Sequence, residues 1–444
     1  MKKNIYVIGF GASAIGFLQK AIKDSLLDEY DITVFDRGTD IGKCSFGGMK
    51  YDGKLISSEE VGGEWFSLES QDKAVEYIKS KITIPDAIIS TGESFHSVDD
   101  NYKKFYYAGF KLHSAKYTHC GTDLLENAVS NIYNEFVKSG IQFKFGYTFE
   151  TIHKSRTNGN TNMLFSVCDD TDITTESIEL FPTDIVVMAV GRSGVSTIKD
   201  CNTLSKYIMS SSYVDLGIRF EFPHFVTEEL DKVMYEIKCS LDTSNGLVAR
   251  LFCQNPRGFV TTEKYINKNE TLYSVNGHAI SDNKSSNTNL AILVRHSFTE
   301  PFNDSVAFGS AIARLANMLG GGDKVILQTY GDLKRGKRTK KIGRVHPTLD
   351  RKMYILGDLN YALPAKTRES IIEFIEKFSE IVPGFNSPDN LCYGIEVKFY
   401  SNKMRNTEQV CFIGDCSGKT SSIIKAFCHG EILAERIAGG WIDE

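Results

Sequence analysis

This sequence of 444 residues lacks the long apolar run and the charge excess that mark membrane proteins and nucleic-acid-binding proteins. No apolar stretch approaches the roughly 20 residues that cross a bilayer. Neither sign of charge dominates, because 51 Lys and Arg residues face 56 Asp and Glu residues. The missing apolar run argues against a membrane partner, and the net charge of −5 argues against a surface that binds nucleic acid generally. With 41% hydrophobic and 24% charged residues, we expect two or three globular domains.

Cysteine pairs of the kind that bind zinc are also missing. The ten cysteines are scattered along the chain without zinc-type spacing. A secretory leader is not indicated, because the apolar run after Met1-Lys2-Lys3 breaks at Gly9 and has no cleavage pattern. We therefore expect a cytoplasmic protein with reduced thiols and no bound metal.

The first 37 residues have the order strand, glycine loop, helix, strand. A β-branched run over residues 4–8 stops at Gly9 and leads into a G-x-G-x-x-A loop, and a helical pattern of apolar residues follows. A second strand over residues 31–35 ends at Asp36. This arrangement is the dinucleotide-binding fingerprint in its usual context, and an ordinary glycine-rich strand-to-helix turn is the alternative.

Each residue type of the fingerprint has a physical role. Gly9 permits the tight turn, Gly11 lets the backbone approach a pyrophosphate, and Ala14 lets helix and strand pack closely. The unpaired N–H groups at the helix start favour phosphate. Asp36 accepts hydrogen bonds from a ribose hydroxyl in this scheme. The predicted cofactor-binding residues of this segment are Gly9, Gly11, Ala12, Ser13, Ala14, Asp36 and Arg37.

A glycine-dense loop follows Asp36 and extends to Lys54. Such a loop is too long for a simple connection, and long loops inside compact domains tend to be functional. We expect it to lie along the cofactor, although a flexible surface loop is the alternative. Its predicted cofactor-binding residues are Gly42, Lys43, Gly47, Gly48 and Lys54.

The next segments continue an α/β pattern and then change in character. Residues 123–138 predict an amphipathic helix, and residues 184–190 predict a buried parallel strand that ends at Gly191, another predicted cofactor-binding residue. From about residue 206, strand-like stretches separated by polar turns predict an inserted substrate domain.

The chain end returns to the first pattern. A strand over residues 410–413 runs into Gly414-Asp415 and a helix, which is typical of the second flavin motif of two-part FAD proteins. The positive end of that helix would stabilise charge on reduced flavin. A phosphate-binding P-loop is excluded, because only three residues separate Gly414 from Gly418. The predicted cofactor-binding residues here are Gly414, Asp415, Gly418, Lys419 and Thr420.

Nine stretches spread over nearly the whole chain resemble a family of uncharacterised bacterial FAD-dependent dehydrogenases, within the two-dinucleotide-fold flavoproteins. This resemblance implies an FAD cofactor but no known substrate. The sequence departs from the family at residues 49–51 and 192–194, which puts substrate and reductant choice in doubt. The stretches are residues 9–16, 46–48 with 52–55, 189–191, 255–260, 274–278, 331–333, 363–364, 393–398 and 413–415.

Several residues could take part in the chemistry. His278 is the candidate acid or base and Arg257 the candidate clamp for a carboxylate or phosphate, with a structural histidine and a solvated arginine as alternatives. Cys44 has no partner at redox-pair spacing, and Cys416 either approaches the flavin or is buried. No second G-x-G-x-x-G follows a strand, so NAD(P)H would dock transiently if it is the reductant.

A run of seven cations between residues 334 and 344 reverses the sign of charge locally. It could attract a phosphate-bearing substrate, NADPH or RNA, or it could be a solvated loop. It contains no aromatic residue that would stack on bases.

These observations predict an α/β protein with a Rossmann-like FAD-binding domain, a largely parallel sheet and an inserted strand-rich α+β substrate domain. The FAD domain would comprise residues 1–205 and 386–444, and the substrate domain residues 206–385. The expected function is hydride transfer between flavin and a small, anionic organic substrate. An FAD monooxygenase, a flavin-bearing RNA-binding or RNA-modifying protein that uses residues 334–344, and a redox sensor are the alternatives.

Overall fold

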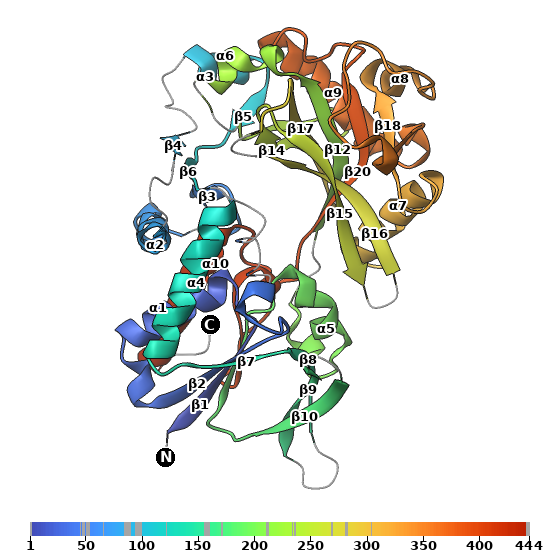
Figure 1. Ribbon diagram of the computed structural model, residues 1–444. Coiled ribbons are helices and arrows are strands. Elements are labelled where there is room, and N and C mark those ends of the chain that lie inside the picture. Colours follow the sequence, from blue (N-terminus) through green and yellow to red (C-terminus); the bar gives the residue numbers. More distant parts are fainter. Residues whose placement is uncertain are drawn as a thin grey trace. The chain divides into compact units, whose positions relative to one another are not determined.

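The computed structural model forms two compact units, which are described here one at a time (Figure 1). Unit 1 comprises Met1–Thr91, Lys116–Ser211 and Tyr400–Glu444, and unit 2 comprises Gly92–Ala115 and Ser212–Phe399. The structure describes residues 2–44, 46, 49, 54–64, 66–83, 90–93, 100–120, 122–154, 160–169, 172–209, 213–232, 234, 237–267, 270–279, 283–302 and 304–440.

The core of unit 1 is a five-stranded parallel sheet with the strand order β21-β11-β1-β2-β7. Its central strands are apolar on both faces, as expected for parallel strands that are covered on both sides. In the register, Ile5 of β1 pairs with Ile32 of β2 and with Ile185 of β11. The strands are β1 Lys3–Ile8, β2 Tyr30–Asp36, β7 Gln142–Phe145, β11 Ile185–Met188 and β21 Val410–Phe412.

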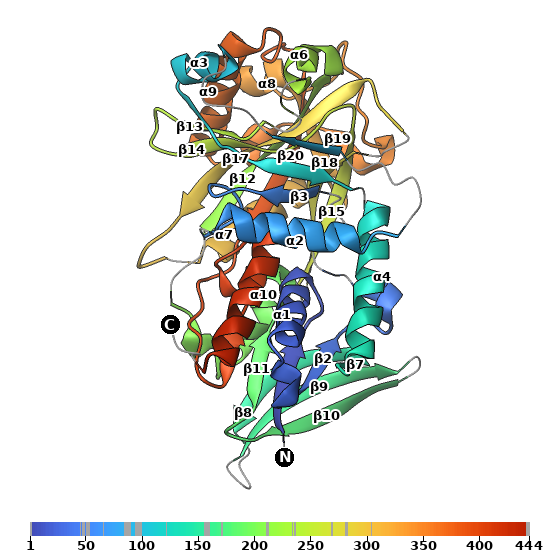
Figure 2. The same cartoon turned by 90° about the vertical axis from the view of Figure 1, so that its left-hand side faces the viewer.

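Two helices from opposite ends of the chain lie side by side in unit 1 (Figure 2). They are α1, Ala12–Lys23, and α10, Ile423–Ala438. A Cβ added at Gly16 would lie 2.1 Å from the Phe427 carbonyl oxygen, and one added at Gly430 would lie 2.0 Å from that of Ser13. Because both glycines lack a side chain, the two helix backbones can touch.

Smaller elements complete unit 1. An antiparallel sheet β8-β9-β10 packs its Phe165 ring on Phe35 of β2, with centroids 4.7 Å apart. Strands β3, β6 and β4 form a second small sheet. The elements are β3 Lys54–Ser57, α2 Leu68–Ser80, β4 Ser90–Glu93, β6 Lys116–His119, α4 Thr122–Lys138, β8 Tyr147–Lys154, β9 Thr161–Asp169, β10 Asp172–Leu180 and α5 Val195–Asp200.

Unit 2 is built on an eight-stranded sheet with the order β19-β18-β20-β12-β17-β14-β13-β5, antiparallel except for the β18–β19 pair. A separate hairpin, β15–β16, packs on its central strands. The strands are β5 Phe110–Leu112, β12 Tyr213–Pro223, β13 Cys239–Asp242, β14 Val248–Asn255, β15 Phe259–Asn267, β16 Glu270–His278, β17 Asn287–Ser297, β18 Val325–Thr329, β19 Tyr354–Leu356 and β20 Leu391–Phe399.

Helices of unit 2 complete its apolar core. Ile371, Phe374 and Phe378 of α9 belong to the same buried cluster as the apolar residues of β12. Among the described residues of the whole chain, no helix is both long and apolar enough to cross a membrane. The helices are α3 Asp100–Tyr107, α6 Glu228–Asp231, α7 Ser305–Leu319, α8 Tyr330–Arg335 and α9 Ala365–Ile381.

Strand β12 alternates strictly between apolar and polar residues, and both of its faces are buried. The apolar residues Val214, Leu216, Ile218, Phe220 and Phe222 belong to the core that contains α9. The other face presents Asp215, Gly217, Arg219 and Glu221, and its three charged side chains are fully buried. Alternation usually predicts one solvated face, but here β16 also packs against β12.

The predicted fold class is confirmed. Unit 1 has the parallel sheet of a Rossmann-like domain, and unit 2 is strand-rich with helices. The unit boundaries lie at residues 211/212 and 399/400, and unit 2 also includes residues 92–115. Strand β20 therefore lies in unit 2, whereas the sequence analysis placed residues 386–399 with the FAD domain. Its hydrogen bonds to β12 and β18, which are distant in sequence, decide this.

The helix contact in unit 1 can be tested with Gly430→Ala. The added methyl group would meet the α1 backbone, so we expect the free energy of unfolding to fall by about 1–3 kcal/mol. Thermal and urea unfolding would measure the change. Gly42→Ala is the control, because only the flexible Asp40 carboxylate lies near that exposed glycine. Equal stability of the two variants would contradict the contact.

Candidate functional site

The glycine loop after β1 needs its first glycine for the fold itself. Gly9 has a φ of +97°, and its N–H donates to the Phe35 carbonyl oxygen at 2.7 Å. An added Cβ would lie 2.7 Å from the carbonyl oxygen of Ala189, the residue after β11. Gly9 therefore joins three neighbouring parallel strands at their carboxyl ends, the edge where open α/β sheets place ligands.

The start of α1 has the properties of an anion site. Its N-cap, Gly11, offers no side-chain cap, and the first turn has no acidic residue. The first-turn residues Ala12, Ser13 and Ala14 are buried. The positive end of the helix is therefore not compensated by a side chain of its own first turn, which suits a pyrophosphate. The Gly11 backbone is extended, with a φ of −126° and a ψ of −169°.

Asp36 holds the glycine loop to the tip of β2. Its Oδ2 accepts the Phe10 N–H at 2.9 Å, and its Oδ1 accepts the Gly38 N–H at 2.8 Å. The carboxylate is buried. Each oxygen keeps capacity for another hydrogen bond, so the predicted contact with a ribose hydroxyl is compatible with this arrangement and stays a prediction.

The C-terminal motif lies directly against the N-terminal one. Gly414 follows β21 with a φ of +67°, and a Cβ added there would lie 2.5 Å from Ser13 Oγ. Arg192, just after β11, forms an ion pair with Asp415, with 3.0 Å between Nε and Oδ2. Thr420 donates a hydrogen bond to Asp415 Oδ1 at 3.1 Å. Segments some 180 and 400 residues from the first fingerprint thus meet it within unit 1.

The other predicted glycines differ in their surroundings. Gly191 has a φ of +62°, and no atom lies within 4 Å of an added Cβ, so there is open space beside it. Gly418 has a φ of +75°, and an added Cβ would lie 2.3 Å from the Asn402 carbonyl oxygen. Gly418 is therefore required by the fold, whereas Gly191 faces room for a ligand.

A segment that the sequence analysis did not assign packs on the C-terminal motif. The Glu64 N–H donates to the Lys419 carbonyl oxygen at 2.7 Å, and Gly63 and Thr420 form a β-bridge. The ammonium group of buried Lys425 donates to the carbonyl oxygens of Glu64 at 2.9 Å and Glu59 at 3.3 Å. Burial lowers the pKa of Lys425. A lysine in the apolar first turn of α10 was the available signal.

His429 of α10 was also missed. Its Nδ1 accepts the Gly414 N–H at 3.2 Å, so this nitrogen carries no proton in the structure described. The ring is buried, and the Ser417 hydroxyl lies 3.4 Å from the same nitrogen. His429 therefore supports the positive-φ turn of Gly414 from behind. Because the two residues are fifteen positions apart, the sequence carries no local signal for this contact.

The loop predicted to lie along the cofactor is only partly described. Arg37, Gly42 and Lys43 are exposed, and the Lys43 ammonium lies 3.4 Å from an Asp40 carboxylate oxygen. Lys54 is buried in β3. Gly47 and Gly48 lie outside the described residues. Their assignment to the cofactor stays a prediction.

The thiol of Cys416 is not suited to reaction with the flavin. Its Sγ donates to the carbonyl oxygens of Met188 at 3.1 Å and Ile413 at 3.2 Å. Burial raises the pKa of Cys416 to about 12, so the thiol is protonated near neutral pH. Of the two interpretations given above for Cys416, the structure supports the buried one.

In unit 2, Arg257 and His278 lie near the same end of the β15–β16 hairpin. A Cβ added at Gly258 would lie 2.6 Å from the His278 carbonyl oxygen. Both predicted residues are exposed, and the Arg257 guanidinium donates to the Ser285 carbonyl oxygen at 3.3 Å. Arg257 has a φ of +53°, which is uncommon for a residue with a side chain.

A histidine and a carboxyl group accompany Arg257. His224 Nδ1 lies 3.0 Å from Thr288 Oγ1 and 3.6 Å from Asp231 Oδ2. Burial, and then the nearby charge of Arg257, lowers the pKa of His224. Burial raises the pKa of Asp231 to about 7, although hydrogen bonds from Thr227 and Gln254 oppose the shift.

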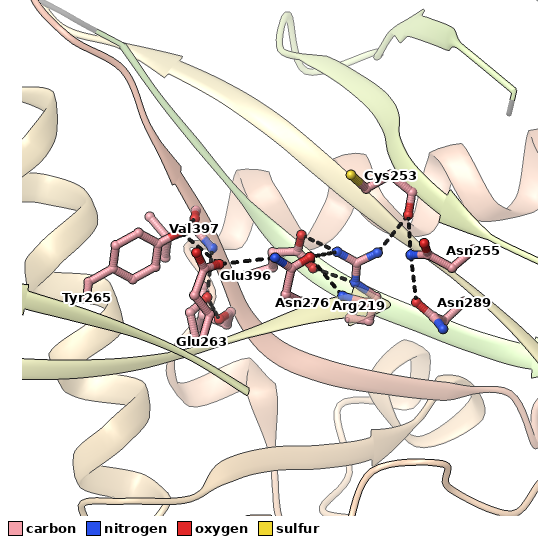
Figure 3. Close-up of polar contacts among 12 residues, drawn as sticks. Arg219, Cys253, Asn255, Glu263, Tyr265, Asn276, Asn289, Glu396 and Val397 are labelled. Carbon is pink, nitrogen blue, oxygen red and sulfur yellow. Dashed lines mark hydrogen bonds and ion pairs between the residues drawn. The ribbon is translucent and has the colours of Figure 1, made fainter. Parts of the chain in front are cut away.

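Buried charges line the polar face of β12 (Figure 3). Arg219 donates to both carboxylate oxygens of Glu396, at 2.8 and 2.6 Å, and to the side-chain oxygen of Asn276 at 3.1 Å. Burial raises the pKa of Glu396 to about 7 against the opposing effect of Arg219. Glu221 accepts hydrogen bonds from Tyr393 and, at 2.9 Å, from Asn287. Figure 3 shows Asn276 linking Arg219 to Glu263.

Cations gather around one aromatic ring of unit 2. The Lys398 ammonium lies 3.6 Å from the centroid of the Phe252 ring. The Lys238 ammonium lies 5.3 Å from the same centroid, and the Arg250 guanidinium lies 5.4 Å from it. Arg250 also pairs with the buried Asp215. Positive charge therefore gathers around Phe252 of β14.

Comparison with known proteins assigns part of the chain. Residues 218–399 match the family described as FAD-dependent protein, C-terminal domain-like. An uncharacterised protein of Clostridium beijerinckii is 25% identical, in an alignment that covers 98% of this chain and 81% of that protein.

The chain is also similar to solved structures. One is a flavoprotein/dehydrogenase from Cytophaga hutchinsonii, which is 10% identical in an alignment that covers 100% of this chain and 80% of that chain, with a TM-score of 0.41. Another is L-proline dehydrogenase from P. horikoshii, which is 12% identical in an alignment that covers 99% of this chain and 94% of that chain, with a TM-score of 0.41. We draw nothing further from these two, because TM-scores under 0.5 do not establish a shared fold.

The N-terminal unit and the matched family together define the class of protein. The match over residues 218–399 places this chain among FAD-dependent proteins, and FAD is its cofactor. The sequence prediction is confirmed at this level. The residues around the start of α1 fit the group, because an uncapped helix end and the open space at Gly191 lie beside Gly414 and Asp415.

Asp36→Asn tests how the fingerprint is held together. An amide has one accepting oxygen, so either the Phe10 or the Gly38 N–H loses its acceptor in a buried place. We expect the apoprotein to lose about 1–3 kcal/mol of unfolding free energy in urea titrations. Asp31→Asn, at the exposed start of β2, is the control and should be neutral. Unchanged stability of Asp36→Asn would assign that carboxylate to the ligand alone.

Asp231→Asn tests the perturbed carboxyl group. Because its pKa is raised to about 7 in the fold, Asp231 contributes stability that is greatest below its unfolded pKa of about 4 and is lost as the pH rises towards 7. The amide of the variant cannot ionise. We therefore expect the unfolding free energy of the wild type minus that of the variant to fall between pH 4.5 and 7.5 and to stay constant above that range. Urea unfolding at each pH measures it. A constant difference would show an ionised carboxylate throughout.

Proposed function

We propose that this chain transfers a hydride between FAD, bound by unit 1, and a small anionic organic substrate, bound by unit 2. One observation carries the cofactor site: Gly414 of the C-terminal motif packs on Ser13 of the N-terminal fingerprint. Neither segment forms a site alone. Together they bring a helix start, two carboxylates and several glycines to one edge of the parallel sheet.

The proposed roles of the unit 1 residues follow from their contacts. The N–H groups at the start of α1 would bind the pyrophosphate, and Asp36 would bind the adenosine ribose. Asp415, oriented by Arg192 and Thr420, would bind the remaining polar part of the cofactor. Bound flavin supplies the hydride chemistry, and the chain supplies position and charge.

Two features of unit 2 support an anionic substrate. Arg257 is exposed with its guanidinium next to Ser285, and a guanidinium can bind a carboxylate or phosphate through two hydrogen bonds. The cations around Phe252 add positive charge on the same unit. In this proposal Arg257 orients the substrate anion, and His278, exposed at the end of β16, gives or takes a proton.

The electron source and the location complete the proposal. The sequence contains no further strand followed by G-x-G-x-x-G, so NAD(P)H, if it is the reductant, docks without a domain of its own. A cytoplasmic location agrees with ten scattered cysteines that show no paired framework.

Purified protein tests the proposal directly. We expect FAD to be released on denaturation, and we expect its oxidised absorbance band to bleach when the protein is mixed anaerobically with a substrate or reductant. The probes are NADH, NADPH and a panel of small carboxylates and phosphate esters. A colourless protein that neither releases nor takes up FAD would contradict the proposal. Bleaching followed by oxygen-dependent hydroxylation of a substrate would favour a monooxygenase instead.

Two glycine variants separate the ligand's needs from those of the fold. Alanine adopts the extended backbone of Gly11 readily, so Gly11→Ala should leave apoprotein unfolding unchanged while FAD affinity falls at least tenfold. Gly9→Ala is the matched comparison, because its φ of +97° and the nearby Ala189 oxygen predict lower stability. Thermal unfolding and flavin fluorescence titrations measure both. Wild-type FAD affinity in Gly11→Ala would contradict a pyrophosphate at this helix start.

A further inference from the structure

The basic run at residues 334–344 separates into paired and unpaired cations. Lys334 pairs with Glu376 at 2.7 Å, Arg335 with Asp332 at 2.9 Å, and Arg344 with Asp389 at 2.5 Å. The Arg338 guanidinium donates to the Leu356 carbonyl oxygen at 3.1 Å. The remaining three, Lys337, Lys340 and Lys341, are exposed and have no acidic partner in the part of the chain that the structure describes.

The backbone between these lysines is held in one conformation. Thr339 is fully buried: its hydroxyl donates to Asp332 at 2.8 Å and accepts the Thr329 N–H at 3.0 Å. The Gln328 side chain donates to the Lys337 carbonyl oxygen at 2.7 Å. The unpaired cations therefore stand on a preformed loop, so little backbone entropy is lost when a ligand binds.

The tertiary structure adds an aromatic side chain that the run itself lacks. The same Gln328 side chain donates to Asp358 and accepts the Leu359 N–H, and the Thr339 N–H donates to the Gly357 carbonyl oxygen. These bonds fasten the loop to the short turn Leu359–Tyr361. Tyr361 ends this turn and is 74% exposed.

Further positive charge lies beside the loop, at the edge of the sheet. Strand β19 is the edge strand, next to β18, and exposed Arg351 and Lys352 immediately precede it. Residues 334–352 contain nine Lys and Arg residues and a single acid, Asp350, in a chain whose net charge is −5. The charge of this segment is therefore opposite in sign to that of the chain as a whole.

We propose that this surface binds single-stranded nucleic acid. We call it the Lys340 surface and define it as Lys337, Arg338, Lys340, Lys341 and Tyr361. The unpaired lysines would contact successive phosphates, and the exposed phenol ring would stack on a base. This activity goes beyond hydride transfer and does not depend on it.

The composition of the Lys340 surface favours a nucleic acid over an acidic protein. Protein interfaces have an apolar core and are depleted of lysine, whereas this surface is rich in lysine and has one exposed ring. A single strand is favoured over a duplex, because an exposed ring can stack only on an unpaired base.

Fluorescence anisotropy with a labelled 12-nucleotide oligo(U) tests the proposal, on the full-length protein between 50 and 200 mM salt. We expect the triple variant Lys337→Gln, Lys340→Gln, Lys341→Gln to bind at least tenfold more weakly at 50 mM salt. Each phosphate contact contributes about 0.7 to the slope of log affinity against log salt, so the slope should fall by about 2. Tyr361→Ala should weaken binding with little change of slope.

The control is a second triple variant, with the substitutions Lys138→Gln, Lys154→Gln and Lys206→Gln. It removes the same number of positive charges from exposed positions of unit 1. It should bind like wild type. Equal slopes for the two triple variants, or no wild-type binding at 50 mM salt, would overturn the proposal. Tighter binding of a 12-base-pair duplex would overturn the single-strand assignment, and equal competition by polyglutamate would indicate an acidic protein. FAD content and anaerobic bleaching should be unchanged in every variant, which separates this test from that of hydride transfer.

Discussion

The contact between α1 and α10 is the constraint on which the cofactor site depends. Each helix presents a glycine to the other's backbone, Gly16 to Phe427 and Gly430 to Ser13, so the helices approach more closely than side chains would permit. The same approach sets Gly414 against Ser13. A methyl group at either glycine would separate the two chain ends and, with them, the two halves of the site. The second flavin motif is therefore positioned by packing, and its own sequence determines only the local turn.

Unit 2 depends on a different device, a sheet face of buried charge. Replacing a buried ion pair by apolar residues is often neutral or stabilising, so pairs such as Arg219 with Glu396 are weak evidence for stability. What Arg219 does is fasten three strands: it contacts Glu396 of β20, the Cys253 carbonyl oxygen of β14 and Asn276 of β16. A guanidinium has enough donors in a fixed plane to do this. The polar layer thus fixes how the β15–β16 hairpin, which ends at His278, lies on the sheet.

Local pattern predicted a large part of the fold. The fingerprint from β1 to Asp36, the helix α4 and the buried strand β11 could be predicted from periodicity and turn residues, because each is decided by neighbours within a few positions. The β12 alternation was also visible, but its burial was not, since alternation usually indicates a solvated face. The assignment of β20 to unit 2 could not be predicted, because the sequence of a strand does not determine which other strands it pairs with. Cys416 was left open between two environments, and burial decided it.

The sequence by itself determined the class of cofactor, because a tight turn, a helix start and an acid at a strand tip need only local order. Only the tertiary structure decided which residues, distant in sequence, complete the cofactor site and the Lys340 surface. It brought His429 behind Gly414, the Lys425 ammonium to the carbonyl groups of residues 59–64, and Tyr361 beside the lysines of the Lys340 surface. The contact of Lys425 with Glu64 joins residues 361 positions apart, and His429 lies fifteen positions from Gly414. Periodicity carries no information at such distances, because only the packing of helices and strands brings these groups together.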